Sequence, residues 1–200
     1  QQLEKSGGRT LGELLNTVSG INIIGANNHP GNNLTASIRG SSAGNVLILL
    51  DGIPVNDPSV ISNYFDLNFI AIDQIETIEM LKGGQSTLYG SDAVAGVINI
   101  ISRKAGTKKI NVNATLSAGS YNTFKQAVGI NGRTSVMDYS IDYLHLSSKG
   151  FSAAHDSTGN KNFDKDGLNQ HTLNGRFGFK ISERLKAIAS GTYSNYKNDL

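Results

Sequence analysis

Val46-Leu-Ile-Leu-Leu-Asp-Gly-Ile-Pro54 is the stretch that decides the fold of the first half of the chain. Five consecutive apolar residues are typical of a strand that is covered on both faces. The Asp51-Gly52 pair that follows favours a tight hairpin turn, because glycine adopts a positive φ without steric cost. The stretch therefore predicts a buried strand that ends in a hairpin.

Other elements of a small α+β fold surround this strand. Thr10-Leu-Gly-Glu13 is a capping box, in which the Thr hydroxyl and the Glu carboxylate each bind an orphan backbone N–H. Apolar residues from Leu11 to Val18 then recur at helical spacing, and Gly20 stands where the helix should stop, after about three turns. Runs rich in Ile, Leu and Val predict strands at 21–24, 35–39, 46–50, 75–81 and 96–102.

The pattern changes near Gly106. Apolar and polar residues alternate from there on, which predicts antiparallel strands at 110–118, 123–131, 139–145, 170–179 and 185–193. The charge changes as well: residues 1–106 have 6 Lys and Arg against 9 Asp and Glu, whereas residues 107–200 have 12 against 7. We therefore expect two domains, at 1–106 and 107–200.

Composition and motifs argue against several functions. The cations do not form the concentrated patch typical of nucleic-acid binding, so no nucleic-acid partner is expected. Glu76 and Glu79 are three residues apart on a predicted strand and would face opposite sides of it. No Ser, His and Asp arrangement suggests a nucleophile, and Gly83-Gly84 lacks the spacing of a phosphate loop. The chain is therefore predicted not to be an enzyme, and to require no cofactor.

Several segments together resemble TonB-dependent outer-membrane receptors. They are Ser37-Ile-Arg-Gly40, Val46 to Pro54, Ile75-Glu-Thr-Ile-Glu79, Lys82-Gly83, Leu88-Tyr-Gly90 and Gly96-Val-Ile-Asn-Ile-Ile101. The resemblance implies an α+β plug domain at 1–106, followed at 107–200 by the first antiparallel strands of a transmembrane β-barrel. Barrels of this plugged kind have about 22 strands, so the chain is expected to be an excerpt.

The resemblance also implies a place and partners. The expected location is the outer membrane of a Gram-negative bacterium, in contact with its lipid. The expected function is energy-coupled uptake of a scarce nutrient. The energy would come through TonB and its inner-membrane energising complex, and the segment that contacts TonB is expected upstream of Gln1.

The substrate class is less settled by the sequence. Tyr89-Gly-Ser-Asp-Ala-Val-Ala-Gly96 with Asn99-Ile-Ile101 resembles the cobalamin-receptor branch. An alternative is a siderophore-iron receptor of the same family. A third alternative is a soluble or surface binding module with a plug-like domain that does not transport. It remains open because a soluble β-meander has the same alternating pattern as a barrel.

Two basic residues match positions that hold the plug inside the barrel. Arg39 follows a predicted strand, and in the family the matching Arg is held by carboxylates of the inner barrel wall. Its planar fork suits carboxylates, and an Arg inside a protein has to be paired. Lys82 matches a second position where Arg is usual, although Lys offers only a point charge.

Two polar loops are candidates for ligand contact, because in the family the corresponding loops face outward. They are Gly25-Ala-Asn-Asn-His-Pro-Gly-Asn-Asn33 and Val55-Asn-Asp-Pro-Ser-Val-Ile-Ser-Asn-Tyr64. Amide, hydroxyl and phenol groups offer hydrogen bonds to an amide-rich ligand. The candidate residues are Asn28, His29, Asn56, Ser62, Asn63 and Tyr64.

One acidic segment predicts a structural Ca²⁺ site. Asn162-Phe-Asp-Lys-Asp-Gly167 has oxygen side chains at alternate positions before a Gly, like the first half of a calcium loop. The cobalamin-receptor branch binds calcium in the corresponding connection, which would make Asn162, Asp164 and Asp166 the ligands. Calcium should then raise the thermal midpoint of the full receptor, and Asp164→Ala with Asp166→Ala should abolish the rise.

Overall fold

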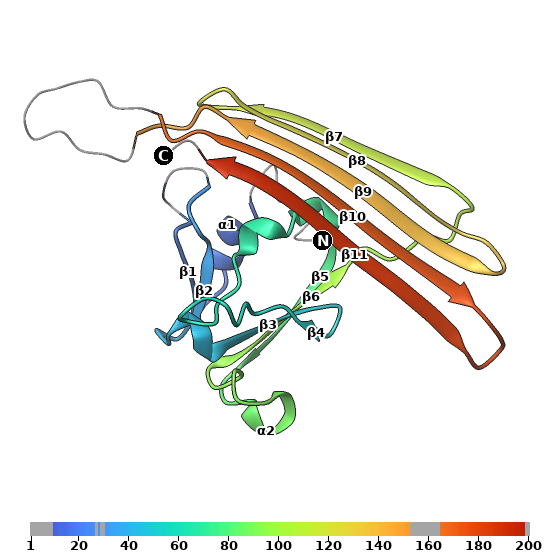
Figure 1. Cartoon of the computed structure of the whole chain (residues 1–200), viewed down its shortest axis with the longest axis horizontal. Coiled ribbons are helices and arrows are strands. Elements are labelled where there is room, and N and C mark those ends of the chain that lie inside the picture. The colour runs from blue at the N-terminus through green and yellow to red at the C-terminus, as the bar shows by residue number, and fades with distance from the viewer. Residues whose placement is uncertain (1–9, 27, 29–30, 153–164, 199–200) are drawn as a thin grey trace, which may run out of the picture. The chain divides into compact units, whose positions relative to one another are not determined.

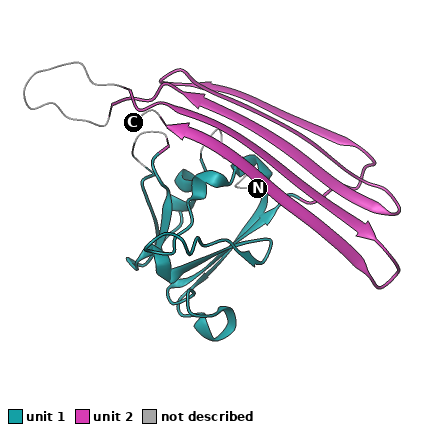
Figure 2. Ribbon diagram, in the orientation of Figure 1, with its two compact units in different colours: residues 1–28, 32–103 teal, residues 29–31, 104–200 magenta. Residues whose placement is uncertain are grey.

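The computed structural model describes residues 10–26, 28, 31–152 and 165–198. These residues form two compact units (Figure 2). The first unit comprises described residues up to 28 and from 32 to 103, and the second comprises residue 31 and described residues from 104 onward. The change from one unit to the next along the chain therefore lies close to the change in sequence pattern at Gly106.

The helix α1 (Leu11–Asn16) begins as the sequence predicts and ends earlier. The Thr10 hydroxyl accepts a hydrogen bond from the Glu13 N–H at 3.2 Å, and the Glu13 carboxylate accepts one from the Thr10 N–H at 2.8 Å. The helix is six residues long instead of three turns. It stops because the backbone N–H and hydroxyl of Thr17 both donate to the Leu14 carbonyl, which tightens the last turn.

The first unit contains every strand expected there (Figure 1). Among the described residues its elements after α1 are β1 (Ile21–Ile24), β2 (Thr35–Ile38), η1 (Ala43–Asn45), β3 (Val46–Leu50), β4 (Ile53–Pro54), η2 (Leu67–Phe69), η3 (Ile72–Gln74), β5 (Ile75–Lys82), α2 (Ser86–Tyr89) and β6 (Gly96–Ser102). Strands β1 and β2 pair with each other, and the other four form a sheet in the order β4-β3-β6-β5. Strands β3 and β6 are the two central strands of this sheet and run parallel to each other. A central position covers β3 on both faces, which explains why the sequence of β3 is continuously apolar.

An aliphatic core holds the first unit together. It packs α1 and the β1–β2 pair against one face of the larger sheet, with Leu15, Ile38 and Ile98 among its fully buried members. A smaller cluster of Leu47, Leu49, Ala93 and Val97 covers the opposite face. Both faces of β3 and β6 are therefore buried, as in a soluble domain.

The Asp51-Gly52 turn has the predicted left-handed backbone. Asp51 has a φ of 53° and Gly52 a φ of 82°. The Asp51 carboxylate accepts hydrogen bonds from the Ser102 N–H at 2.8 Å and from the Ser102 hydroxyl at 2.5 Å. The side-chain oxygen of Asn99 accepts one from the Gly52 N–H at 3.2 Å. The turn is thus fastened to the end of β6, and its Asp has a structural task.

The second unit is an antiparallel sheet of successive strands, each hydrogen-bonded to the next. Its described strands are β7 (Asn111–Gly119), β8 (Thr123–Arg133), β9 (Met137–Ser148), β10 (Leu168–Lys180) and β11 (Lys186–Asn198). All of the predicted strands are present, and β9 and β11 extend several residues beyond the predicted ends. The extension follows from pairing, since β10 and β11 stay in register from Leu168↔Asn198 to Lys180↔Lys186.

The two faces of this sheet differ in polarity. The register places one set of alternating residues on a common face, which we call the apolar face, and large hydrophobic side chains are exposed there. They include Val112, Leu116, Val128, Ile130, Ile141, Tyr143, Leu173, Phe179 and Tyr193. Side chains on the opposite face, the polar face, include Asn113, Asn131, Asp138, Ser140, Asp142, Thr172, Asn174 and Arg176.

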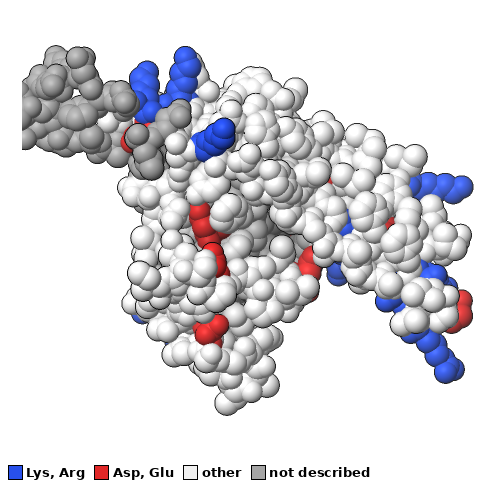
Figure 3. Space-filling model, in the orientation of Figure 1, with Lys and Arg blue, Asp and Glu red and all other residues white. Residues whose placement is uncertain are grey.

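Charged groups on the polar face pair with one another. Arg176 pairs with Asp138 at 3.4 Å, and Lys186 Nζ also contacts the Asp138 carboxylate, which is almost fully buried. The Ser140 hydroxyl donates to Asp142 at 2.8 Å. In Figure 3 the Lys and Arg side chains gather mainly toward the ends of the strands, and the stretch between them is nearly free of charge on the visible face.

Within the described part of the chain, no helix combines the length and hydropathy needed to span a membrane.

Candidate functional site

The two candidate ligand loops are joined by hydrogen bonds. Asn33 Nδ2 donates to the Tyr64 hydroxyl at 3.0 Å. Asn68 Nδ2 donates to the Asn32 carbonyl at 2.8 Å, and the Asp66 carboxylate accepts from the Leu34 N–H at 3.0 Å. Segments some thirty residues apart in sequence are therefore joined into one site, which we call the paired loops (residues 32–34 and 55–68).

Asn56 holds the second of these loops in place. Its side-chain oxygen accepts a hydrogen bond from the Ile48 N–H at 2.8 Å, and its Nδ2 donates to the Val46 carbonyl at 3.1 Å and to the Asn63 carbonyl at 2.9 Å. The amide protons are fully used in pinning the loop to β3. Asn56 is thus suited to position the loop and has little left to offer a ligand.

Asn63 and Ser62 also have local tasks. Asn63 has a φ of 44°, and its Nδ2 donates to Asp92 at 3.0 Å. The Ser62 carbonyl lies so close to Gly44 that a Cβ built there would stand 2.2 Å from the oxygen, so only glycine fits. The Ser62 hydroxyl belongs to an exposed residue and can meet a ligand.

Tyr64 and Asn28 are better placed to meet a ligand. The Tyr64 hydroxyl accepts from Asn33 and keeps its own proton to donate. Asn28 is exposed, and its backbone N–H closes a turn onto the Gly25 carbonyl at 3.1 Å. His29 lies outside the described residues.

Sequence reasoning missed Asp66 and Asn68. Asp66 caps η2, since its carboxylate also accepts from the Asn68 N–H at 3.0 Å. Asp is one of the residue types preferred at the position before a helix, which was the available signal. Nothing in the sequence could show that the same carboxylate also reaches Leu34.

The two predicted docking residues converge on one turn, Ser19-Gly20, which follows α1. The Arg39 N–H donates to the Gly20 carbonyl at 2.9 Å, and Lys82 Nζ donates to the Ser19 carbonyl. Arg39 has a φ of 53° and leaves the strand, so β2 ends at Ile38 instead of residue 39. Arg39 is an exposed residue, and its guanidinium forms no ion pair with any residue that the structure describes. A role of either residue in docking stays a prediction.

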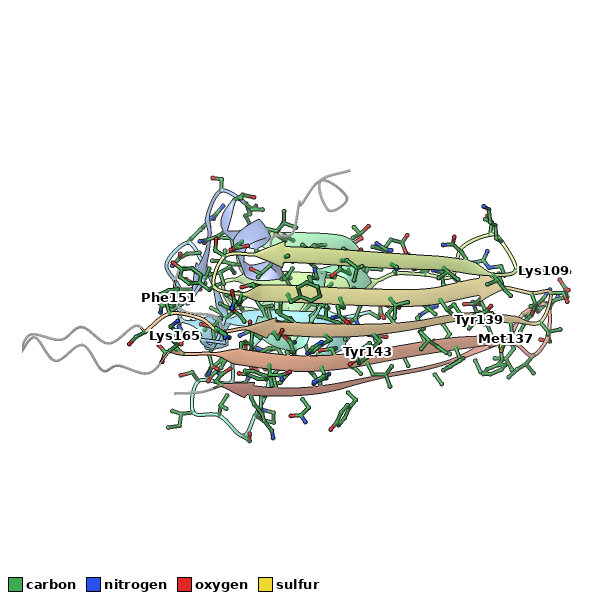
Figure 4. The ribbon with its side chains drawn as sticks, turned by 90° about the horizontal axis from the view of Figure 1, so that it is seen from above. Lys109, Met137, Tyr139, Tyr143, Phe151 and Lys165 are labelled. Carbon is green, nitrogen blue, oxygen red and sulfur yellow. The ribbon has the colours of Figure 1, made fainter. Side chains whose placement is uncertain are left out.

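The predicted calcium ligands are only partly within the described residues. Asn162 and Asp164 lie outside them. Asp166 is half-buried, and its backbone N–H donates to the Phe151 carbonyl at 3.4 Å. Phe151 and Lys165 lie close together at that end of the sheet (Figure 4). In the described part of the chain, no three His, Asp or Glu side chains converge as metal ligands, so calcium binding stays a prediction.

One electrostatic shift is resolved in the paired loops. The pKa of Asp57 is lowered from its usual 3.8, chiefly because the Ser59 hydroxyl donates to its carboxylate at 2.7 Å, and next because the Ser59 N–H does so at 2.8 Å. Asp57 is fully exposed and stays ionised at neutral pH. The paired loops therefore have a fixed negative charge.

Comparison with known proteins agrees with this architecture. Residues 1–97 match the family described as TonB-dependent Receptor Plug Domain. The ferric enterobactin receptor of Pseudomonas aeruginosa is 34% identical over 108 residues, which cover 49% of this chain and 14% of that receptor. Residues 1–97 therefore form a plug domain of the TonB-dependent receptor family, and antiparallel strands follow this domain along the chain.

Solved structures extend the match to both units. The siderophore receptor PirA from Acinetobacter baumannii superposes with a TM-score of 0.76 at 25% identity, covering 98% of this chain and 31% of PirA. The copper transporter OprC superposes with a TM-score of 0.74 at 19% identity, covering 94% of this chain and 28% of OprC, a likeness of fold alone. The chain thus spans about a third or less of the proteins it matches.

These findings confirm the predicted family and fold class. The family consists of receptors and transporters, which agrees with the prediction that the chain is not an enzyme. They do not support the predicted cobalamin branch, because the similar proteins reported above include an enterobactin receptor and a siderophore receptor. The siderophore alternative fits better. Of the residues on which the cobalamin reading depends, Asn99 has a local role, because its Nδ2 donates to Glu79 at 3.0 Å and its oxygen accepts from the Gly52 N–H at 3.2 Å.

Proposed function

We propose that this chain is part of an outer-membrane receptor that takes up a ferric siderophore by energy-coupled transport. The observation that carries the proposal is the sheet of the second unit, whose apolar face exposes large side chains while its polar face pairs its charges internally. Lipid-facing strands alternate in this way. The plug domain in the same chain and its siderophore-receptor relatives support the substrate class.

TonB would supply the energy, with its inner-membrane complex, and Arg39 and Lys82 would hold the plug in the closed barrel. Both residues bond to the Ser19-Gly20 turn, Arg39 through its backbone N–H and Lys82 through its ammonium group, which supports a docking role for the two neighbouring positions. The outer membrane would be the location. In this reading the soluble binding module is disfavoured, because water would have to cover a broad exposed apolar face.

The paired loops point to the charge of the ligand. Residues 25–34 and 55–64 contain no Lys or Arg, and the second range contains Asp57. A strongly anionic ferric tris-catecholate needs cationic partners, because buried charge must be paired. Asn, Ser and Tyr groups instead match the amide and hydroxamate oxygens of a neutral chelate. The ligand at these loops is therefore a neutral ferric chelate rich in amide groups.

Uptake of radiolabelled iron tests the function. A strain that lacks the gene should lose uptake of one class of ferric siderophore, and removal of TonB should cause the same loss. Intact iron uptake together with lost cobalamin uptake would refute the siderophore reading and restore the cobalamin one.

Binding to the full receptor in detergent tests the ligand class. A neutral ferric hydroxamate should bind at least about tenfold more tightly than a ferric tris-catecholate, a difference of about 1.4 kcal/mol. Tyr64→Phe should weaken the hydroxamate about fivefold to tenfold, since one hydrogen bond contributes about 1 kcal/mol. Ile61→Ala, a change at an exposed residue of the same loop, is the control. Preference for the catecholate would contradict the charge argument.

A further inference from the structure

A pair of histidines lies on the apolar face of the second unit. His145 on β9 and His171 on β10 are directly opposite each other in the strand register. Their rings stack with centroids 4.5 Å apart and planes within 8°. Neither ring belongs to the paired loops, the docking turn or the acidic segment described above, so the proposed function leaves this pair without a task.

Tyr143 fixes one of the two rings. Its hydroxyl lies 2.8 Å from His171 Nδ1, so that contact takes up one ring nitrogen and leaves Nε2 for another partner. An outer group that holds one nitrogen of a metal-binding imidazole is the usual way in which such a ring is oriented. His171 is exposed and His145 is half-buried, so at least one ring can be reached from outside.

The histidines belong to a polar row across four strands. The register continues from Gln126 on β8 through His145 and His171 to Asn195 on β11. The neighbouring row contains Val128, Tyr143, Leu173 and Tyr193. Figure 4 shows Tyr143 on β9, well away from the end marked by Met137 and Tyr139. The pair thus stands where the apolar side chains give way to polar ones, toward the 149–167 connection, and has amide groups on both sides.

We propose that His145 and His171 form a binding site for a borderline divalent cation, of the class of Cu²⁺, Ni²⁺ or Zn²⁺. Imidazole nitrogen is the ligand that these ions share. Two nitrogens on one ion, each at about 2.0–2.1 Å, stand at most about 4 Å apart. The 4.5 Å separates the ring centroids, and the lone pairs of the nitrogens lie in the ring planes. Both rings must therefore turn out of their stacked arrangement, by rotation about χ2, before two nitrogens point at one ion. Water or the amide oxygens of Gln126 and Asn195 complete the coordination.

The ion would join β9 to β10. These two strands are connected by residues 149–167, whereas β10 and β11 are connected by residues 181–185. A crosslink between strands gains most where the connection is long, because the chain entropy of the unfolded state is then reduced most. Binding energy for the native site also appears directly as stability.

Copper titration of the full receptor in detergent tests the site. With Cu²⁺ alone as the probe, the electron paramagnetic resonance spectrum should show coupling to two imidazole nitrogens. His145→Gln and His171→Gln should each lower the affinity at least about tenfold and leave coupling to one nitrogen at most. Tyr143→Phe should lower the affinity about tenfold while keeping both nitrogens, as expected of a group that orients a ligand.

Controls separate this site from other histidines and from misfolding. His29→Gln and His155→Gln should leave the two-nitrogen spectrum unchanged. A change of gel mobility on heating equal to that of the wild type shows that each variant retains its folded barrel. Zn²⁺ should raise the thermal midpoint of the wild type and not that of His145→Gln. Two-nitrogen coupling that survives in both His145→Gln and His171→Gln, or no copper binding by the wild type, would overturn the proposal.

Discussion

The two units of this chain arrange polarity in opposite ways. The first unit buries its aliphatic side chains between α1, the β1–β2 pair and the larger sheet. The second exposes aliphatic and aromatic side chains on one face of its sheet and keeps its charged pairs on the other. A fold stable in water buries apolar area, whereas a fold stable in lipid must satisfy its polar groups internally. The difference is the one expected if, as proposed, water surrounds the first unit and lipid covers the apolar face of the second.

The largest effect is expected from a matched pair of Ile→Ala substitutions, one in each unit. Ile98 is completely buried, whereas Ile130 is 41% exposed on the apolar face. Ile98→Ala should cost about 2–5 kcal/mol of plug stability, because it leaves a cavity. Ile130→Ala should cost about 0.5 kcal/mol or less. Urea unfolding of the receptor in detergent, followed by one fluorophore on the plug and another on the sheet of the second unit, measures both, and equal losses would erase the contrast.

A charge placed on each face of the sheet sharpens the comparison next. Leu173→Arg puts a cation on the apolar face and should cost about 2–4 kcal/mol if lipid covers that face near mid-bilayer. Asn174→Arg is the control on the polar face, where the lost partner is the Thr192 hydroxyl at 3.1 Å. The measurement is the yield of folded receptor in lipid vesicles. If Asn174→Arg impairs folding as much as Leu173→Arg, lipid does not cover the apolar face.

The hairpin at Asp51 tests how far the plug depends on polar contacts. Asp51→Ala removes both hydrogen bonds from Ser102 and places Ala at a φ of 53°. The loss should be about 1–3 kcal/mol, from unsatisfied groups and backbone strain. Asp51→Asn, which tolerates that backbone and keeps one acceptor, should lose less. The same urea titration compares the losses of stability in Asp51→Ala and Asp51→Asn. Equal losses would show that a side-chain acceptor at this position contributes nothing.

The smallest effect concerns Asp57 and acid. Because the pKa of this carboxyl is lower in the folded protein than its usual 3.8, its contribution to stability is present above pH 3.8 and is lost as the pH falls through the folded value. The wild type should therefore exceed Asp57→Asn in thermal midpoint at pH 6, and the difference should fade under strong acid. Ser59→Ala should reduce the difference at pH 6, since it removes the main cause of the shift. A gap that widens in acid would contradict this assignment.

The order and type of most elements could be predicted from local sequence patterns. The capping box at Thr10, the apolar run at Val46–Leu50 and the alternation after Gly106 are local patterns, and each depends only on neighbours along the chain. The family resemblance was based on short local motifs of this kind, and it is confirmed. Lengths were less predictable: α1 is shorter because Thr17 closes its last turn, and β9 and β11 are longer because strand pairing extends them.

Only the tertiary structure decided which side chains meet. Arg39 and Lys82 reach the same turn, Asn56 uses its amide to hold β3, and Tyr64 bonds to Asn33 across thirty residues of sequence. The stacking of His145 on His171 depends on the exact register of β9 against β10, and a shift by one residue would put the two rings on opposite faces. Periodicity fixes which face a residue occupies, while its partner is set by long-range pairing, which leaves no local signal in the sequence.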